Sequence, residues 1–143
     1  MNIGWPGKII KEGMMSEVKR MLVVDDEHEI CDFLKTFFEE RDYEVRTANS
    51  GEAALIAMEK SKPQVVLLDV HMPGMDGMSA LREIKNRFPG VKVIMVTALE
   101  TREKIEEALR LGADNYITKP LSLEYLEKDV QEKIAHLSKS VPV

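Results

Sequence analysis

The sequence predicts a doubly wound α/β domain, in which a five-stranded parallel sheet carries helices on both faces. Strand-like and helix-like patterns alternate five times between residues 20 and 140, which favours parallel strands joined by right-handed helical crossovers. Two of the strand patterns, residues 20–25 and 64–70, are continuous apolar runs, as expected for strands covered on both faces. The chain has 143 residues, a length that suits one domain with a sizeable core.

The first half of the chain contains two strand–helix pairs. The apolar strand over residues 20–25 precedes a helix over 27–41, and the alternating stretch 43–48 is typical of an edge strand with one exposed face. A second helix, over 50–61, opens with Ser50. The apolar positions of the first helix recur at helical spacing; they are Ile30, Phe33, Leu34, Phe37 and Phe38.

The second half continues the alternation. The expected strands cover residues 64–70, 91–97 and 114–118, and the expected helices cover residues 78–88, 101–112 and 122–140. The last helix has an apolar stripe that consists of Leu123, Leu126, Val130, Ile134 and Leu137. One domain over residues 20–140 is therefore expected. Residues 1–19 are rich in glycine and are expected to form an irregular N-terminal arm, part of which is compatible with an artificial leader.

The overall composition narrows the classes of function. With 25 acidic and 20 basic residues the formal net charge is −5, which argues against direct binding of nucleic acid by this chain and suits a cation or a basic partner. The single cysteine, Cys31, cannot form an internal disulfide. The sequence lacks a run of about 18 apolar residues, so no membrane span is expected. These features together predict a cytoplasmic protein.

Polar residues stand at the carboxyl ends of four of the five strands. Asp25 and Asp26 follow the first strand, Asp69 ends the second apolar strand, and Thr97 and Lys119 close the last two. Because the carboxyl ends of parallel strands lie at one edge of the sheet, where ligands of such folds bind, we expect the five side chains to form one site.

Each of these residues also has a structural explanation when it is taken alone. Asp26 and Glu29 are spaced like a capping box for the first helix, Asp69 can open the turn at Pro73–Gly74, and Thr97 is a β-branched residue that suits a strand. A chance coincidence at four strand ends is much less probable than any one of these explanations. The set is therefore better explained by a functional site.

The chemistry of the set is coherent. Three converging carboxylates make a site for a hard cation such as Mg²⁺, and the cation relieves the repulsion between Asp25 and Asp26. Lys119 supplies a positive charge and Thr97 a hydroxyl group. A metal, an ammonium and a hydroxyl around a carboxylate are what phosphoryl transfer requires, and a carboxylate can serve as the nucleophile.

Four motifs at these separations resemble a known family. They are "VVDD" at 23–26, "LLDVHMPGMDG" at 67–77, "VTA" at 96–98 and "ADNYITKP" at 113–120. Together they are similar to the receiver domain of two-component response regulators, and the resemblance covers residues 20–138. It implies the flavodoxin-like strand order 2-1-3-4-5 and a regulatory phosphoacceptor, not an enzyme with an external substrate.

The resemblance also implies the roles of the site residues. Asp69 would accept a phosphoryl group from a histidine kinase or a histidine phosphotransfer protein. Mg²⁺ would be held by Asp25, Asp26, Asp69 and the backbone carbonyl of His71. Lys119 would pair with the phosphoryl oxygens, and its peptide bond with Pro120 would be cis.

The same resemblance implies a conformational switch. Thr97 and Tyr116 match the switch pair of the family, which reshapes the surface of the fourth helix, fifth strand and fifth helix and can lead to a phosphorylation-dependent dimer. His71 and Leu99 occupy the two positions at which family members tune the lifetime of the acyl phosphate. An apolar Leu99 offers no help in orienting a water, which favours a longer-lived phosphoryl state.

Two alternatives remain open from the sequence. The chain ends soon after the last helix, so its output is expected to be a contact in trans with a downstream protein; the alternative is a receiver fragment of a larger DNA-binding response regulator. A Mg²⁺-dependent phosphohydrolase of the haloacid dehalogenase type also uses an Asp nucleophile, a Thr and a Lys. That chemistry wants a second Asp two residues after the nucleophile, where this chain has His71.

Overall fold

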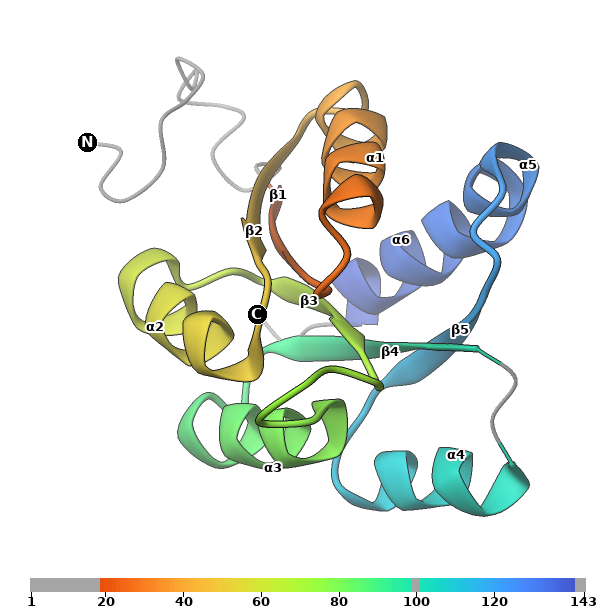
Figure 1. Ribbon diagram of the computed structural model, residues 1–143. Helices are drawn as coiled ribbons and strands as arrows, with labels where there is room; N and C mark the ends of the chain where they lie inside the picture. The colour runs from red at the N-terminus through yellow and green to blue at the C-terminus, as the bar shows by residue number, and fades with distance from the viewer. Residues whose placement is uncertain (1–18, 99–100, 141–143) are drawn as a thin grey trace.

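The computed structural model describes residues 19–98 and 101–140 (Figure 1). The expected N-terminal arm, apart from Lys19, and the expected tuning residue Leu99 lie outside the described residues. The strands are β1 (Lys19–Val24), β2 (Tyr43–Ala48), β3 (Val65–Asp69), β4 (Lys92–Ala98) and β5 (Asn115–Lys119). The helices are α1 (His28–Glu39), α2 (Gly51–Ser61), α3 (Gly77–Arg87), α4 (Arg102–Arg110), α5 (Leu123–Tyr125), the π-helical η2 (Leu126–Val130) and α6 (Gln131–Ser140).

The sheet has the expected topology. All four neighbouring strand pairs are parallel, and the strand order is β2-β1-β3-β4-β5. The two continuous apolar runs form β1 and β3, which lie beside each other in the interior of the sheet with Met21 opposite Val65 and Val24 opposite Leu68. This arrangement places the ends of β1 and β3 in adjacent positions.

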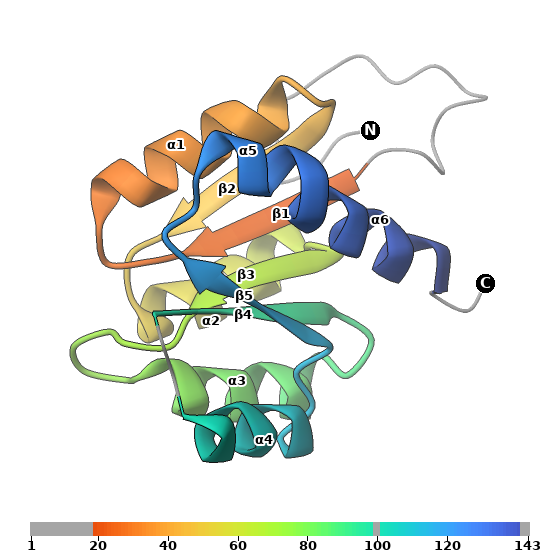
Figure 2. The same ribbon diagram turned by 90° about the vertical axis from the view of Figure 1, so that its right-hand side faces the viewer.

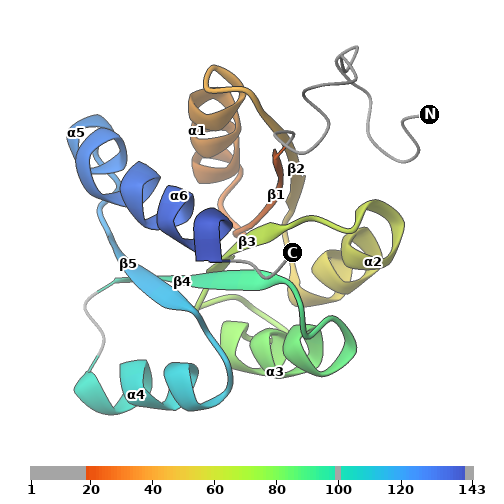
Figure 3. The same ribbon diagram turned by 180° about the vertical axis from the view of Figure 1, so that it is seen from behind.

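The helices cover both faces of the sheet and bury two separate apolar clusters. In Figures 1 and 3, α1 and the α5–η2–α6 segment lie on one side of the sheet, and α2, α3 and α4 lie on the other. The cluster under α1 and α6 contains the fully buried Phe38 and Ile134. The cluster under α2, α3 and α4 contains Met58, Leu81 and Ala108. Among the described helices, none has the length and apolarity needed to cross a membrane.

The first helix begins differently from the expectation. The expected capping box of Asp26 and Glu29 does not form: the N-cap residue of α1 is Glu27, and no side chain caps that end. Instead, the backbone N–H of Glu27 donates a hydrogen bond to Oδ1 of Asp25, at 2.9 Å. Asp25 is the buried member of the pair and Asp26 is exposed, so the structural explanation of Asp26 as a helix cap is wrong.

The last helix is continuous but not regular. Figure 2 shows α5 and α6 as one helical segment, and its central five residues, Leu126–Val130, form a π-helix. Such π segments place one extra residue in a turn and often occur at functional positions. Of the expected apolar stripe, Leu126, Val130, Ile134 and Leu137 are buried, whereas Leu123 is 53% exposed.

Two further side chains differ from the expected burial. β2 lies at an edge of the sheet, as expected, but Glu44 on its supposedly exposed face is only 6% exposed. Phe33 of α1 is 40% exposed, although the periodicity placed it with the core residues. Cys31 is buried in the core under α1, in keeping with an apolar role.

Candidate functional site

Three carboxylates meet where β1 and β3 end. Asp25 and Asp26 directly follow β1, and Asp69 is the last residue of the adjacent strand β3. One oxygen atom of each of the three lies within 4.8 Å of the others. Asp25 and Asp69 are 2% and 4% exposed, whereas Asp26 faces solvent. Figure 2 shows the sheet from the side, with the ends of β1 and β3 pointing the same way.

Lys119 joins the same cluster from the far edge of the sheet. It is the last residue of β5, and its Nζ atom lies 3.1 Å from Oδ2 of Asp25 and 3.4 Å from Oδ1 of Asp69. A longer contact of 3.7 Å joins it to the exposed Glu27. The peptide bond from Lys119 to Pro120 is cis. The ammonium group thus contacts both buried carboxylates.

Burial and the charges of the cluster disfavour the ionised form of Asp69. Burial and the charge of Asp25 raise the pKa of Asp69 from its ordinary value of 3.8 to about 6, although Lys119 and the backbone N–H of His71 act in the opposite direction. Burial lowers the pKa of Lys119, but the charges of Asp69 and Asp25 outweigh burial and leave that pKa raised. One ammonium therefore does not neutralise the carboxylates around it.

The excess negative charge of these carboxylates fits a divalent cation. Mg²⁺ prefers oxygen ligands, of which one or two carboxylates are typical, and the cluster of Asp25, Asp26 and Asp69 supplies three converging oxygens. Receiver-like chemistry would add a backbone carbonyl from the loop after β3. Within the part of the chain that the structure describes, this is the one group of acidic, cysteine or histidine side chains with the convergence that a metal requires.

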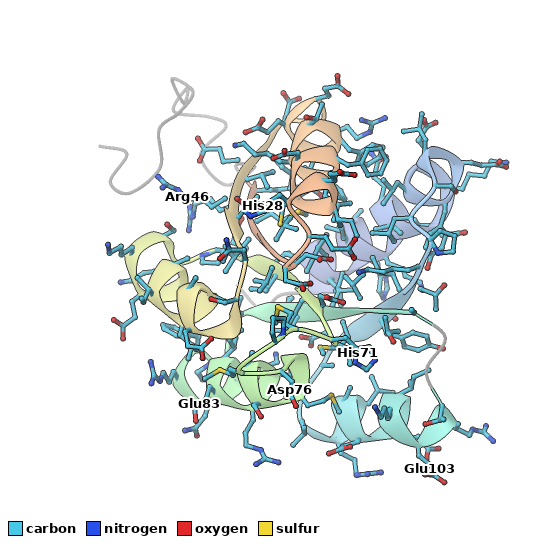
Figure 4. The ribbon with its side chains drawn as sticks, in the orientation of Figure 1. His28, Arg46, His71, Asp76, Glu83 and Glu103 are labelled. Carbon is cyan, nitrogen blue, oxygen red and sulfur yellow. The ribbon has the colours of Figure 1, made fainter. Side chains whose placement is uncertain are left out.

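The loop between β3 and α3 is held close to Asp69 by a glycine. The backbone N–H of Gly77 donates to the carbonyl of Val70 at 2.9 Å, and a Cβ atom at Gly77 would lie 2.2 Å from the backbone oxygen of Asp69. Figure 4 shows His71 and Asp76 on this loop, at the same end of the molecule. The His71 side chain is exposed, and Asp76 caps α3 by accepting from the N–H of Ser79.

Gly77 is a site-forming residue to which the sequence reasoning gave no role. Gly77 ends the segment "LLDVHMPGMDG", in which Pro73 and Gly74 are the residues that predict a turn. The signal that could have identified it is a glycine directly after Asp76, a residue type that favours helix N-caps. A glycine at the first helical position there indicates that another backbone approaches closely.

The expected switch pair lies under α4. Thr97 is 2% exposed, and its hydroxyl donates to the carbonyl of Ala98 at 3.2 Å. Tyr116, on the neighbouring strand β5, is half-buried. Both residues line one small cavity together with Ile105 and Ala108 of α4. The structure therefore brings Thr97 and Tyr116 together against the helix that the predicted switch would reshape.

Comparisons with known proteins identify one family. The model of the response regulator receiver domain matches residues 21–131. Regulatory protein AtoC of Escherichia coli (strain K12) is 39% identical over 120 residues, which are 84% of this chain and 26% of that protein. This chain thus spans only about a quarter of the length of the first curated relatives that it matches.

Solved structures lead to the same class. A receiver domain protein (CheY-like) from Methanospirillum hungatei JF-1 is similar with a TM-score of 0.77 and 34% identity, over 85% of this chain and 98% of that one. NtrX from Brucella abortus gives a TM-score of 0.77 and 34% identity, over 85% of this chain and 28% of that one. These structures share the five-stranded parallel sheet of this chain and are receiver domains or contain one.

The chain belongs to the family of response regulator receiver domains. This family is regulatory and does not consist of metabolic enzymes. Its members work with histidine kinases and bind Mg²⁺ in an acidic pocket, and relatives such as NtrX carry further domains beyond the matched part.

Proposed function

We propose that Asp69 accepts a phosphoryl group from the phosphohistidine of a histidine kinase or a histidine phosphotransfer protein. The observation that carries this proposal is the buried cluster at the strand ends, in which Lys119 lies 3.4 Å from Oδ1 of Asp69 and 3.1 Å from Asp25. Asp69 is the member of the cluster that ends a central strand and that the Gly77 turn presents at the sheet edge. Burial of the nucleophile among fixed charges is the arrangement that phosphoryl transfer needs.

The transfer exchanges one bond for another. A carboxylate oxygen of Asp69 forms a bond to phosphorus while the bond from phosphorus to the imidazole nitrogen of the donor breaks, and the imidazole keeps the electron pair and takes up a proton. Lys119 then pairs with a phosphoryl oxygen, because its ammonium already stands beside Asp69. Thr97 can turn its hydroxyl from the carbonyl of Ala98 to another phosphoryl oxygen.

The metal that the family uses would be held by Asp25, Asp26 and Asp69, with the backbone carbonyl of His71 as a further ligand. A bound Mg²⁺ would neutralise negative charge on the carboxylates and on the incoming phosphoryl oxygens. Asp25 has two roles in this scheme, because its Oδ1 also accepts the N–H of Glu27 and thereby fixes the start of α1.

The proposed consequence of phosphorylation is a change in the surface made by α4, β5 and α5. Thr97 and Tyr116 line the cavity under α4, so a movement of the hydroxyl toward the phosphoryl group leaves space into which the ring of Tyr116 can turn. The new charge biases an element with two conformations. We propose that the changed surface contacts a downstream protein, an output domain of a longer chain, or a second copy. We also propose that this takes place in the cytoplasm, where ATP is available to the kinase.

The test is the intact mass of the protein after incubation with Mg²⁺ and a small phosphodonor such as acetyl phosphate. One labile phosphoryl adduct is expected on the parent chain, and none on Asp69→Asn. Asp32→Asn, an exposed carboxylate of α1, is the matched control and should form the adduct like the parent. An adduct that persists in Asp69→Asn would refute the assignment of the acceptor, and steady release of phosphate without an adduct would indicate a phosphohydrolase instead.

A further inference from the structure

Side chains of the same chain form hydrogen bonds with backbone groups at the outer edge of β5. β5 is the last strand of the sheet, so every second backbone N–H and C=O group points away from β4. Asn115 accepts the N–H of Tyr116 at 2.8 Å, and the hydroxyl of Tyr125 accepts the N–H of Thr118 at 3.1 Å. The ammonium of Lys133 donates to the carbonyl of Tyr116 at 3.1 Å.

Lys133 contacts the ring of Tyr116 as well as its backbone. Its Nζ atom lies 5.5 Å from the centroid of the Tyr116 ring, within the range in which a cation is attracted to an aromatic face. One ammonium therefore fixes both the strand position and the side-chain position of this residue. A movement of the Tyr116 ring has to break or rearrange the contact with Lys133.

The π segment explains why Lys133 can reach this position. Tyr125 and Lys133 are eight residues apart, which in a regular α-helix would place them about 80° apart around the axis. The π-helical turn at Leu126–Val130 lies between them and adds one residue to the turn. The pair then behaves like residues seven apart, only about 20° out of line, and both side chains contact β5.

We propose that Lys133 is a positioning residue, which holds Tyr116 in the conformation seen here and thereby sets the resting balance of the switch. This inference rests on the proposed role of Tyr116. If the contact stabilises the resting conformer, its loss raises the population of the active one. Phosphorylation and the active conformer are linked equilibria, so the same loss favours phosphorylation.

The released ammonium has an alternative place to go. Lys133 and Tyr125 line a surface cleft of about 470 Å³ together with Asp129, Glu132 and His136. Asp129 precedes Lys133 by four residues, and Glu132 is adjacent to it, so two carboxylates border the same cleft. The cost of breaking the Tyr116 contact is therefore reduced, which is what an element with two accessible states requires.

The experiment compares Lys133→Met, Lys133→Arg and Lys128→Met, each labelled with 3-fluorotyrosine. The chain has three tyrosines, and Tyr116→Phe identifies the ¹⁹F resonance of Tyr116. Lys133→Met keeps the apolar stem and removes the charge, whereas Lys133→Arg keeps a cation that can bond to the carbonyl and stack on the ring. Lys128→Met, which loses only a surface pair with Glu124, is the control on the same helix.

The Tyr116 resonance is expected to move in Lys133→Met and to stay at the parental position in Lys128→Met and Lys133→Arg. If the active conformer is the minor one and the one that reacts, adduct formation with the small phosphodonor should be about fivefold faster in Lys133→Met, in proportion to the rise in its population that about 1 kcal/mol produces. An unchanged Tyr116 resonance, or an unchanged rate of adduct formation in Lys133→Met, would overturn the inference. Failure of the proposed function is distinct, since it appears as a missing adduct on the parent chain.

Discussion

Replacement of Asp69 by Asn is expected to stabilise the metal-free protein while it removes the proposed phosphoryl acceptor. In the folded chain the pKa of Asp69 is raised from 3.8 to about 6, so the folded state binds this proton more tightly than the unfolded state does. A difference from 3.8 to 6 corresponds to about 3 kcal/mol. At pH 7 the ionised Asp69 therefore costs the fold up to about this amount, and Asn removes the charge at nearly constant shape.

The stability difference between Asp69→Asn and the parent chain is expected to depend on pH. Between the unfolded and the folded pKa the native state holds a proton that the unfolded state lacks, so the stability of the parent chain rises as the pH falls from 6 toward 4. The advantage of Asp69→Asn should therefore shrink from about 3 kcal/mol at pH 7 to about 1 kcal/mol at pH 4.5. Below the unfolded value both chains carry a neutral group, and the advantage disappears.

The measurement is urea unfolding of the parent chain and Asp69→Asn in EDTA at pH 7 and pH 4.5. The exposed Asp32→Asn serves as the control and should stay within about 0.5 kcal/mol of the parent. Addition of Mg²⁺ at pH 7 should stabilise the parent by an amount that grows with the metal concentration, and should stabilise Asp69→Asn less. The reasoning is refuted if Asp69→Asn is less stable than the parent at pH 7, or if the difference does not change with pH.

Three further substitutions test other parts of the structure. Gly77→Ala should lower the free energy of unfolding by about 3 kcal/mol or more, because the new Cβ would meet the backbone oxygen of Asp69. Urea unfolding measures this loss. The control is Gly90→Ala, which should cost little because nothing lies within 4 Å of the added Cβ. Asp114→Ala should cost about 2–4 kcal/mol, because the half-buried Asp114 binds Lys85 at 2.9 Å and accepts the N–H of Val93 at 2.8 Å. Glu83→Ala, which breaks the surface pair with Arg87, should cost less than about 1 kcal/mol in thermal unfolding, and equal losses in the two variants would contradict the role given to Asp114. Ser50→Ala should lower the free energy of unfolding by about 1 kcal/mol, because Ser50 caps α2 by accepting the N–H of Ala53. Glu29→Ala should leave it nearly unchanged, because α1 has no capping box. A large loss of stability in Glu29→Ala, measured by circular dichroism, would indicate that Glu29 caps α1 after all.

The strands β1 and β3 could be predicted from the sequence because their central positions are apolar and buried. Their limits differ from those of the hydrophobic runs, because β1 also includes Lys19 and Arg20, and β3 ends at the polar residue Asp69. The meeting of Asp25, Asp69 and Lys119 followed from the same reasoning, since parallel strands place their ends at one edge. What the pattern could not give is the pairing inside the site, where Lys119 already contacts both buried carboxylates.

The failed expectations concern details that depend on competition between neighbours. Asp25 and Asp26 are both suited to cap α1, and tertiary burial decided that Asp25 takes the N–H of Glu27. Periodicity identifies the side of a helix that faces the protein, but it does not show how far along the helix other elements pack against that side. Leu123 and Phe33 were therefore assigned to the core although they are exposed. The π turn has no signal in the residues of Leu126–Val130, and the contact of Lys133 with Tyr116 was therefore invisible in the sequence.

The position of the site at the tips of the strands has a consequence for how such a domain can diverge. The side chains along β1 and β3 fill the two cores, while Asp25, Asp26 and Asp69 stand at or just beyond the last ladder pairs. Folding and chemistry thus draw on separate positions of the same strands. Core residues can be exchanged for others of similar volume without a change in the proposed acceptor, and the exposed faces of the helices can adapt to new partners. A lineage can in this way keep one reaction and change the protein to which that reaction reports.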